Sequence, residues 1–290
     1  MGSESDHQSY FNDANLGLPI CGPVSATCAQ VTSNPRVNPN FTQVLNSYSG
    51  ATANYNAAQV SVTRRFADGL QFAANYTWSH NIDIANTGND FSGALDDPGC
   101  LRCNRGNSYI NTPQVFVANF VYETPTIASW NAVAREATGG WQISGIYRAQ
   151  SGPAFTIICG CTSSWQDDGQ DYPDFATSVH RVHVQHGNLT NYLVASDFVN
   201  PQQGSHGDIG RNPPGVSGPG INTWDLGLSK NFRYTERYRF QFRWEMFNAF
   251  NRPTFASPNN NTSSSTFGLI NSTNNNFPAR VMQVAGKLYF

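Results

Sequence analysis

The sequence predicts an all-β protein, a transmembrane antiparallel β-meander of about seven to eight strands, and three observations support this prediction. In the stretch "RYRFQFRWEMF", residues 237–247, large apolar residues alternate with charged or amide residues, as on a strand with one apolar and one wet face. Charged residues make up only 12% of the 290-residue chain, against about 25% in average globular proteins, while turn formers and aromatic residues are frequent. Short connections alternate with long ones between such segments, as in membrane β-sheets.

Seven segments carry the alternation, and each is expected to be one strand. They are residues 55–66, 70–79, 115–123, 140–150, 223–232, 237–247 and 280–290. The apolar side of the first two consists of Ala58, Val60, Val62, Phe66, Leu70, Phe72, Ala74, Tyr76 and Trp78. The next three contribute Phe116, Ala118, Phe120, Tyr122, Trp141, Ile143, Tyr147, Trp224, Leu226, Leu228 and Phe232. Val117 and Val121 make the opposite side of the third segment less polar than the pattern requires.

The sixth segment has the clearest division between its two sides. Its apolar side consists of Tyr238, Phe240, Phe242, Trp244 and Met246. Its polar side, which is expected to face an aqueous lumen, consists of Arg237, Arg239, Gln241, Arg243 and Glu245. We expect these polar residues to contact other lumen groups rather than a substrate.

The connections predict the orientation of the sheet. Short connections are expected at 67–69 ("ADG") and 233–236 ("RYTE"), and a medium link at 124–138. Long loops are expected at 80–112, 152–220 and 252–278, and residues 1–54 are expected to be an irregular extracellular segment preceding the strands of 55–290. Short turns on the periplasmic side and long loops outside are typical of membrane sheets of this type. Arg64 and Lys230, near the short-turn ends of their strands, are expected to reach toward the lipid headgroups.

Six cysteines lie only in the expected extracellular segments: Cys21, Cys28, Cys100, Cys103, Cys159 and Cys161. An even number in an oxidising compartment favours disulfides, and Cys21–Cys28 and Cys100–Cys103 are the pairs that are close in sequence. The alternative is a zinc site formed by the four thiolates of "CLRC" and "CGC".

Other patterns give weak indications of chemistry. "HRVHVQH" spaces His180, His183 and His186 by three residues, which fits a solvated loop better than a metal site. Two groups of acidic residues in the expected loops lack the spacing of an EF-hand, and we expect polar loops there. They are Asp96 and Asp97, and Asp167, Asp168 and Asp171. No nucleophile, paired-carboxylate or phosphate-loop motif is present, so we expect neither an enzyme nor a cofactor, and a net charge of −2 gives no reason to expect nucleic acid.

Four segments, about two-fifths of the chain, resemble the C-terminal barrel of TonB-dependent outer-membrane receptors, in particular the acidobacterial Oar-like type with a carboxypeptidase-regulatory-like domain. They begin with "NYNAAQVSVTRRF", "GGWQISGIYRAQ", "GDIGRNPPGVSGPG" and "STFGLINSTNNN". The last eight residues, "QVAGKLYF", are similar to the signal read by the outer-membrane assembly machinery. Its positions are Gln283, Ala285, where the family favours glycine, Leu288 and Phe290.

The resemblance implies energy-coupled uptake or surface recognition of a ligand in the outer membrane of a Gram-negative bacterium. Its implied partners are outer-membrane lipid, the rest of the barrel, a plug domain, the TonB complex through an N-terminal region, and the assembly machinery. No signal peptide, TonB box or plug is recognisable in this sequence, and seven strands leave two open edges, so we expect a fragment of a larger barrel. Two alternatives stay open: a soluble disulfide-stapled β-sandwich that binds a partner, and a small self-closing barrel with an eighth strand hidden in 1–54 or 152–220.

Overall fold

The structure, a computed structural model, is dominated by one large antiparallel sheet. It describes residues 2–13, 15, 37–41, 44–84, 100–127, 129, 131–161, 163–164, 171–176, 181–233 and 237–290. The strands of the sheet are β1 (Gly2–Asp13), β2 (Leu45–Ala67), β3 (Leu70–Asp83), β4 (Gly106–Asn107), β5 (Gln114–Glu123), β6 (Trp141–Gln150), β9 (Ile221–Arg233), β10 (Arg239–Phe247) and β11 (Val281–Tyr289). Outside it lie β7 (Asp174–Phe175), β8 (Phe198–Val199), α1 (Ala132–Thr138) and the 3₁₀ turns η1 (Leu101–Asn104) and η2 (Ala195–Asp197).

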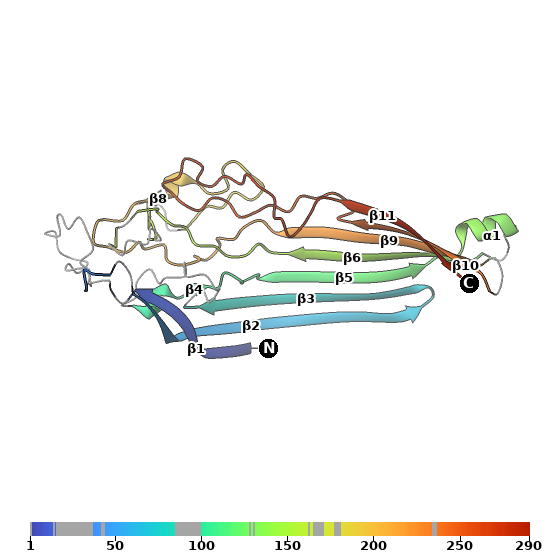
Figure 1. Ribbon diagram of the computed structural model, residues 1–290, viewed down its shortest axis with the longest axis horizontal. Helices are drawn as coiled ribbons and strands as arrows, with labels where there is room; N and C mark the ends of the chain where they lie inside the picture. The colour runs from blue at the N-terminus through green and yellow to red at the C-terminus, as the bar shows by residue number, and fades with distance from the viewer. Residues whose placement is uncertain are drawn as a thin grey trace.

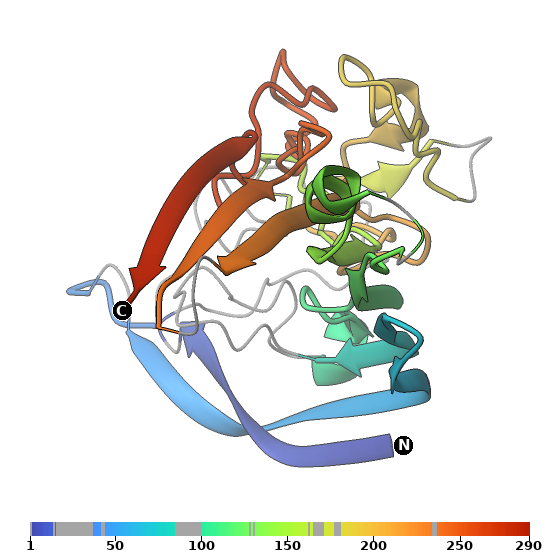
Figure 2. The same cartoon turned by 90° about the vertical axis from the view of Figure 1, so that its right-hand side faces the viewer.

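The seven predicted strands are confirmed as a meander. The strand order is β1-β2-β3-β5-β6-β9-β10-β11, each antiparallel to the next, with the short β4 beside β3. In Figure 1 the long strands lie side by side, with the long loops at one end of the sheet and α1 at the other. Viewed end on, the sheet forms an open curved arc (Figure 2). In the described part of the chain β1 and β11 are its two edges, and they do not pair with each other.

The register places all the apolar stripes on the same face, because residues directly opposite on antiparallel strands point to the same side. One row across the sheet runs Val284, Trp244, Leu228, Ile143, Tyr122 and Leu70. The neighbouring row on the other face runs Gln283, Glu245, Gly227, Ser144, Val121 and Gln71. The sheet therefore has one apolar face and one mostly polar face, as the alternation predicts.

The apolar face is not covered by a second layer in the part of the chain that the structure describes. Val284 is 67% exposed, Trp78 62% and Val60 60%, and the buried apolar residues all lie outside the predicted stripes. Aromatic rings on this face contact their neighbours within the layer: Tyr147 stacks on Trp224 with centroids 4.5 Å apart. A sandwich would bury this face against another sheet, so the soluble-sandwich alternative does not fit this arrangement.

The short-turn end of the sheet is built from tight local geometry. Asp68 and Gly69 link β2 to β3 with positive φ angles of 51° and 76°. This is the two-residue hairpin conformation that Asp-Gly favours, because glycine carries no Cβ. No described helix is long and apolar enough to cross a membrane.

Lys230 departs from its expected role at this end. It is only 2% exposed, and its Nζ donates to the main-chain oxygens of Glu136 and, at 2.9 Å, of Gly139. The ammonium also lies 5.4 Å from the centroid of the Trp141 ring. Lys230 thus caps the C-terminal end of α1 instead of reaching outward, because the free carbonyls of a helix end offer a cation nearby partners.

The expectation of irregular chain throughout 1–54 is corrected by β1 and by the early start of β2. β1 pairs with Leu45–Asn56 of β2, from Gly2 opposite Asn56 to Asp13 opposite Leu45. The segment "SESDHQSYFND" has no apolar alternation, so the sequence carries no strand signal there. Ladder hydrogen bonds along the unusually long β2 provide the pairing instead.

The main hydrophobic core lies in the loops, not on the sheet. Residues from 155–216 and 255–270 form one loop lobe with its own core. Its buried members are Ile157, Tyr192, Leu193, Phe198, Ile209, Val216 and Ile270. The expected loops 152–220 and 252–278 therefore fold together at one end of the sheet (Figure 1).

Replacing Lys230 by methionine removes the cation that caps α1 while keeping most of the side-chain volume. We expect the free energy of unfolding, measured by urea titration in detergent micelles, to fall by about 2 kcal/mol, because charge-assisted hydrogen bonds to two main-chain oxygens are lost. Amide exchange in α1 should quicken in the same variant. Lys287→Met, on the polar face of β11, is the matched control; an equal loss of stability there would contradict the capping role.

Candidate functional site

The polar face of the last strands forms a hydrogen-bonded ladder. Arg243 donates to the carboxylate of Glu245, and Gln283 of β11 donates to the other oxygen of the same carboxylate. Further along the face, Gln241 Nε2 donates to Asn231 Oδ1 at 3.2 Å. Three of the predicted lumen residues thus contact polar groups of their own or neighbouring strands.

The first two predicted lumen residues lie at the short-turn end. Arg239 begins β10, and its guanidinium lies 4.3 Å from the centroid of the Tyr289 ring. Arg237 precedes the strand, 5.9 Å from the centroid of the Tyr238 ring. These cation–π contacts anchor positive charge beside aromatic rings, an arrangement typical of a membrane boundary.

The four residues of the predicted assembly signal lie on or just beyond the β11 edge. Gln283, Ala285 and Leu288 lie opposite Glu245, Arg243 and Phe240 in the β10–β11 register. Phe290 follows the strand and is 86% exposed. The positions are therefore accessible along the sheet edge, while their recognition stays a prediction.

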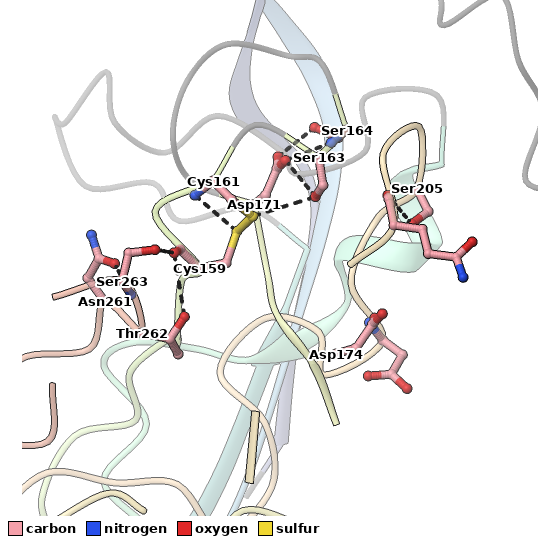
Figure 3. Close-up of a disulfide and its surroundings, with 12 residues drawn as sticks. Cys159, Cys161, Ser163, Ser164, Asp171, Asp174, Ser205, Asn261, Thr262 and Ser263 are labelled. Carbon is pink, nitrogen blue, oxygen red and sulfur yellow. Dashed lines mark hydrogen bonds between the residues drawn. A yellow bond between two sulfur atoms is a disulfide. The ribbon is translucent and has the colours of Figure 1, made fainter. Parts of the chain in front are cut away.

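Cys159 and Cys161 form a disulfide within the loop lobe (Figure 3). The Cys159 amide donates to Asp171 O at 2.8 Å, and its carbonyl accepts from Ser263 Oγ at 2.5 Å. The "CGC" turn therefore joins the 152–220 loop to the 252–278 loop. Cys100 and Cys103 form a second disulfide, as their spacing predicts, with Cα atoms 5.3 Å apart. Pairing in disulfides leaves no thiolates for the zinc alternative, and Cys21 and Cys28 lie outside the described residues.

Asp171 has a structural role in the lobe. Its carboxylate accepts hydrogen bonds from Ser163 Oγ at 3.0 Å, from Ser164 N at 2.7 Å and from Ser164 Oγ at 2.5 Å (Figure 3). With its acceptors occupied by these donors, the buried carboxylate orders the turn. The other acidic residues of the expected polar loops, Asp96, Asp97, Asp167 and Asp168, lie outside the described residues.

The two described histidines of "HRVHVQH" do not converge on one point. His183 Nδ1 lies 2.9 Å from Asp197 Oδ2, and the His183 amide donates to the same oxygen. His186 Nδ1 lies 3.2 Å from the hydroxyl of Tyr192, whose ring it meets edge-on. Each imidazole thus has its own partner, and the described residues contain no group of three metal-ligating side chains. His180 lies outside the described residues.

A buried ion pair between Arg211 and Asp83 joins the lobe to the sheet. Arg211 Nη2 donates to the carboxylate of Asp83, at the end of β3, and at 2.6 Å to its main-chain oxygen. Arg211 Nε donates to Asn104 O at 2.9 Å. The neighbouring Asn212, with φ +43°, exchanges hydrogen bonds with Asn107 of β4. This joint is not among the sites predicted from the sequence; the density of turn residues in "GRNPPG" was the available signal.

Burial raises the pKa of two titratable side chains in the lobe, Tyr192 and Asp174. Desolvation raises the pKa of Tyr192 to about 12, while its hydroxyl donates to Ser217 O at 2.8 Å. Desolvation is also the main cause that raises the pKa of Asp174; the Asp208 amide partly opposes it and the Asp208 carboxylate adds to it. Both shifts favour the neutral forms of these side chains within the lobe.

A family model described as an outer membrane beta barrel domain matches residues 1–283. The chain belongs to this family. Its antiparallel sheet, with one uncovered apolar face, is accordingly a transmembrane sheet of the outer membrane. A solved structure of P. aeruginosa FpvA bound to heterologous pyoverdines is similar over 88% of this chain, with 11% identity and a TM-score of 0.37. The chain spans only 21% of the length of that protein. No curated protein matches the chain.

Removing the Arg211 side chain should detach the lobe from the sheet. In Arg211→Ala, the Asp83 carboxylate is left buried without its cation, and we expect the free energy of unfolding to fall by about 3–5 kcal/mol. We also expect proteolysis between β9 and the lobe to become faster. Arg64→Ala, which breaks the exposed pair with Asp68, should cost at most about 1 kcal/mol. Equal losses in the two variants would contradict the joint.

Raising the pH should destabilise the lobe through Tyr192. The unfolded phenol ionises near 10 and the folded one has a pKa of about 12, so the folded state holds its proton more tightly, and stability falls as the pH rises through this window. Absorbance at 295 nm should show one phenol titrating late, and this signal should be lost in Tyr192→Phe. A profile unchanged by the substitution would be inconsistent with this assignment.

Proposed function

We propose that the chain is the C-terminal barrel segment of a TonB-dependent outer-membrane receptor of the Oar-like type, which recognises a ligand outside and takes part in its energy-coupled uptake. The observation that carries the proposal is the pairing of an uncovered apolar face with a polar face, combined with short turns at one end and a folded loop lobe at the other. Membrane barrels place short turns in the periplasm and long loops outside.

The two open edges of the sheet support the interpretation that the chain is a segment of a larger barrel. From β2 to β11 the strand direction reverses six times, because each strand is antiparallel to the next. After an even number of reversals β11 runs in the same direction as β2, from the loop end to the short-turn end. β1 pairs only with Leu45–Asn56, on the loop side of the apolar stripe that begins at Ala58. Seven strands therefore cross the apolar band, and their outer strands are parallel to each other. An antiparallel barrel needs further strands between them, which argues against the self-closing alternative despite the extra strand in 1–54.

Each part of the segment then has a place in the receptor. The polar ladder of Arg243, Glu245 and Gln283 faces the lumen, where a plug domain would contact it. The loop lobe, pre-organised by its own core, presents the ligand-facing surface. Coupling to TonB would occur through an N-terminal region of the receptor. No described residues form a catalytic constellation, and the proposal includes no enzymatic step or cofactor.

Arginine substitutions at two adjacent positions of β2 test the membrane setting. Val62 lies on the apolar face and Thr63 on the polar face, and both are exposed. Val62→Arg should lower the stability in bilayers by about 2–4 kcal/mol because the charge enters hydrocarbon, whereas Thr63→Arg should have little effect. Urea unfolding in lipid vesicles measures both. In water both sites would accept arginine, so equal stabilities would overturn the proposal.

The receptor assignment itself predicts the genomic context of the chain. The reading frame upstream of the Met1 codon should encode a plug domain and further strands with the same alternation. Sequencing that region checks this expectation. An upstream region without any in-frame barrel would reject the receptor while leaving the membrane sheet in place.

A further inference from the structure

Both disulfides in the described part of the chain close very short loops. Cys100 pairs with Cys103 across two residues, and Cys159 pairs with Cys161 across one. A disulfide stabilises a fold mainly by removing chain entropy from the unfolded state, and this effect is smallest for the shortest loops. Stability alone is therefore a weak reason for either bond, and the surroundings of each pair decide what else it can do.

The two pairs differ in how well a thiol in solution can reach them. Cys103 is exposed, and Cys100 is half-buried at the start of η1. Cys159, by contrast, is 0% exposed. Thiol–disulfide exchange requires an incoming thiolate to reach one of the two sulfurs directly. Cys103 is therefore the member of the first pair that a thiolate can attack.

The residues next to Cys103 are positively charged. The segment 100–107, "CLRCNRGN", contains two arginines and no acidic residue. Arg102 immediately precedes Cys103, Arg105 follows it by two residues, and both arginines are exposed. Cations near a cysteine attract anionic reactants and stabilise the thiolate that exchange releases. The surroundings of Cys103 therefore favour exchange with thiols that carry negative charge.

The same turn holds one side of the joint between the loop lobe and the sheet. The main-chain oxygen of Cys100 accepts hydrogen bonds from Cys103 N and Asn104 Nδ2, both at 3.0 Å. The main-chain oxygen of Asn104 accepts in turn from Arg211 Nε at 2.9 Å, and Asn104 is only 1% exposed. The disulfide thus closes the turn that positions a partner of Arg211.

We propose that the Cys100–Cys103 disulfide is an exchange site for small anionic thiols, and that its opening loosens the joint. A thiolate attacks Cys103 Sγ and forms a mixed disulfide, while the bond to Cys100 breaks and the Cys100 sulfur leaves as a thiolate that takes a proton from water. A second thiol attacks the mixed disulfide and releases Cys103. Two external thiols are thereby oxidised to one disulfide, and the two cysteines gain two electrons and two protons. This site goes beyond the proposed function and does not depend on it.

The rate of opening at each pair tests the site. The folded chain in detergent micelles is incubated with glutathione, which is anionic, or with 2-mercaptoethanol, which is neutral, and the freed thiols are alkylated and located by mass spectrometry. With glutathione, the Cys100–Cys103 pair should open at least about tenfold faster than the pair of the "CGC" turn, because access limits exchange. Hydrogen exchange in the β6–β9 ladder verifies folding. Equal rates at the two pairs would overturn the proposal.

Substitution of the two arginines tests the preference for anionic thiols. The double variant Arg102→Gln, Arg105→Gln should slow opening by glutathione at least about threefold and leave opening by 2-mercaptoethanol unchanged. High salt should slow the glutathione reaction of the unsubstituted chain in the same way. Arg64→Gln, at the short-turn end, is the matched control. A glutathione rate that responds to neither the double substitution nor salt would contradict the assigned thiol class.

Proteolysis tests the link to the joint. Cleavage between the lobe and β9 should become faster when the Cys100–Cys103 pair opens, and the double variant Cys100→Ser, Cys103→Ser should show the same increase without added thiol. Unchanged cleavage in both cases would reject the loosening of the joint. None of these measurements depends on the membrane setting of the sheet, which Val62→Arg and Thr63→Arg test separately.

Discussion

Backbone hydrogen bonding in a solvent that cannot supply it is the constraint on which the structure depends. Hydrocarbon offers amides and carbonyls no partners, so each strand must obtain them from a neighbouring strand. This requirement accounts for the continuous ladder from β2 to β11, for the tight Asp68–Gly69 turn, and for the importance of the two edges. The side chains then divide by face: apolar rows toward lipid, and a polar row, with Arg243, Glu245 and Gln283, toward water.

The loop end follows the rules of a water-soluble protein. There the chain buries Ile157, Leu193 and their neighbours in a core of its own. A disulfide closes the "CGC" turn, and a hydrogen bond from Ser263 to the Cys159 carbonyl joins this turn to the second loop. Arg211 and Asp83 join this lobe to the end of β3 by a buried ion pair. The lobe is therefore attached to the sheet at a defined point.

Patterns with a short repeat were readable from the sequence, and contacts distant in sequence were not. Alternation over five or more residues identified seven of the eight long strands of the sheet, and spacing identified the Cys100–Cys103 disulfide. β1 was missed because its residues do not alternate, and its pairing depends on the length of β2. The partners of Lys230 and Arg211 lie about 90 to 130 residues away, so no local pattern could show that one caps a helix and the other joins the lobe.

The environment of Trp244, on the apolar face, provides the most direct test of hydrocarbon as the solvent of that face. In a variant whose other tryptophans are replaced by phenylalanine, reconstituted in vesicles, bromine atoms on the lipid acyl chains should quench the Trp244 fluorescence strongly, and acrylamide in the water should quench it weakly. A tryptophan placed at Arg243, on the opposite face, should show the reverse. Quenching of Trp244 by acrylamide but not by bromine would contradict a lipid-facing apolar surface, and with it the membrane setting of the whole sheet.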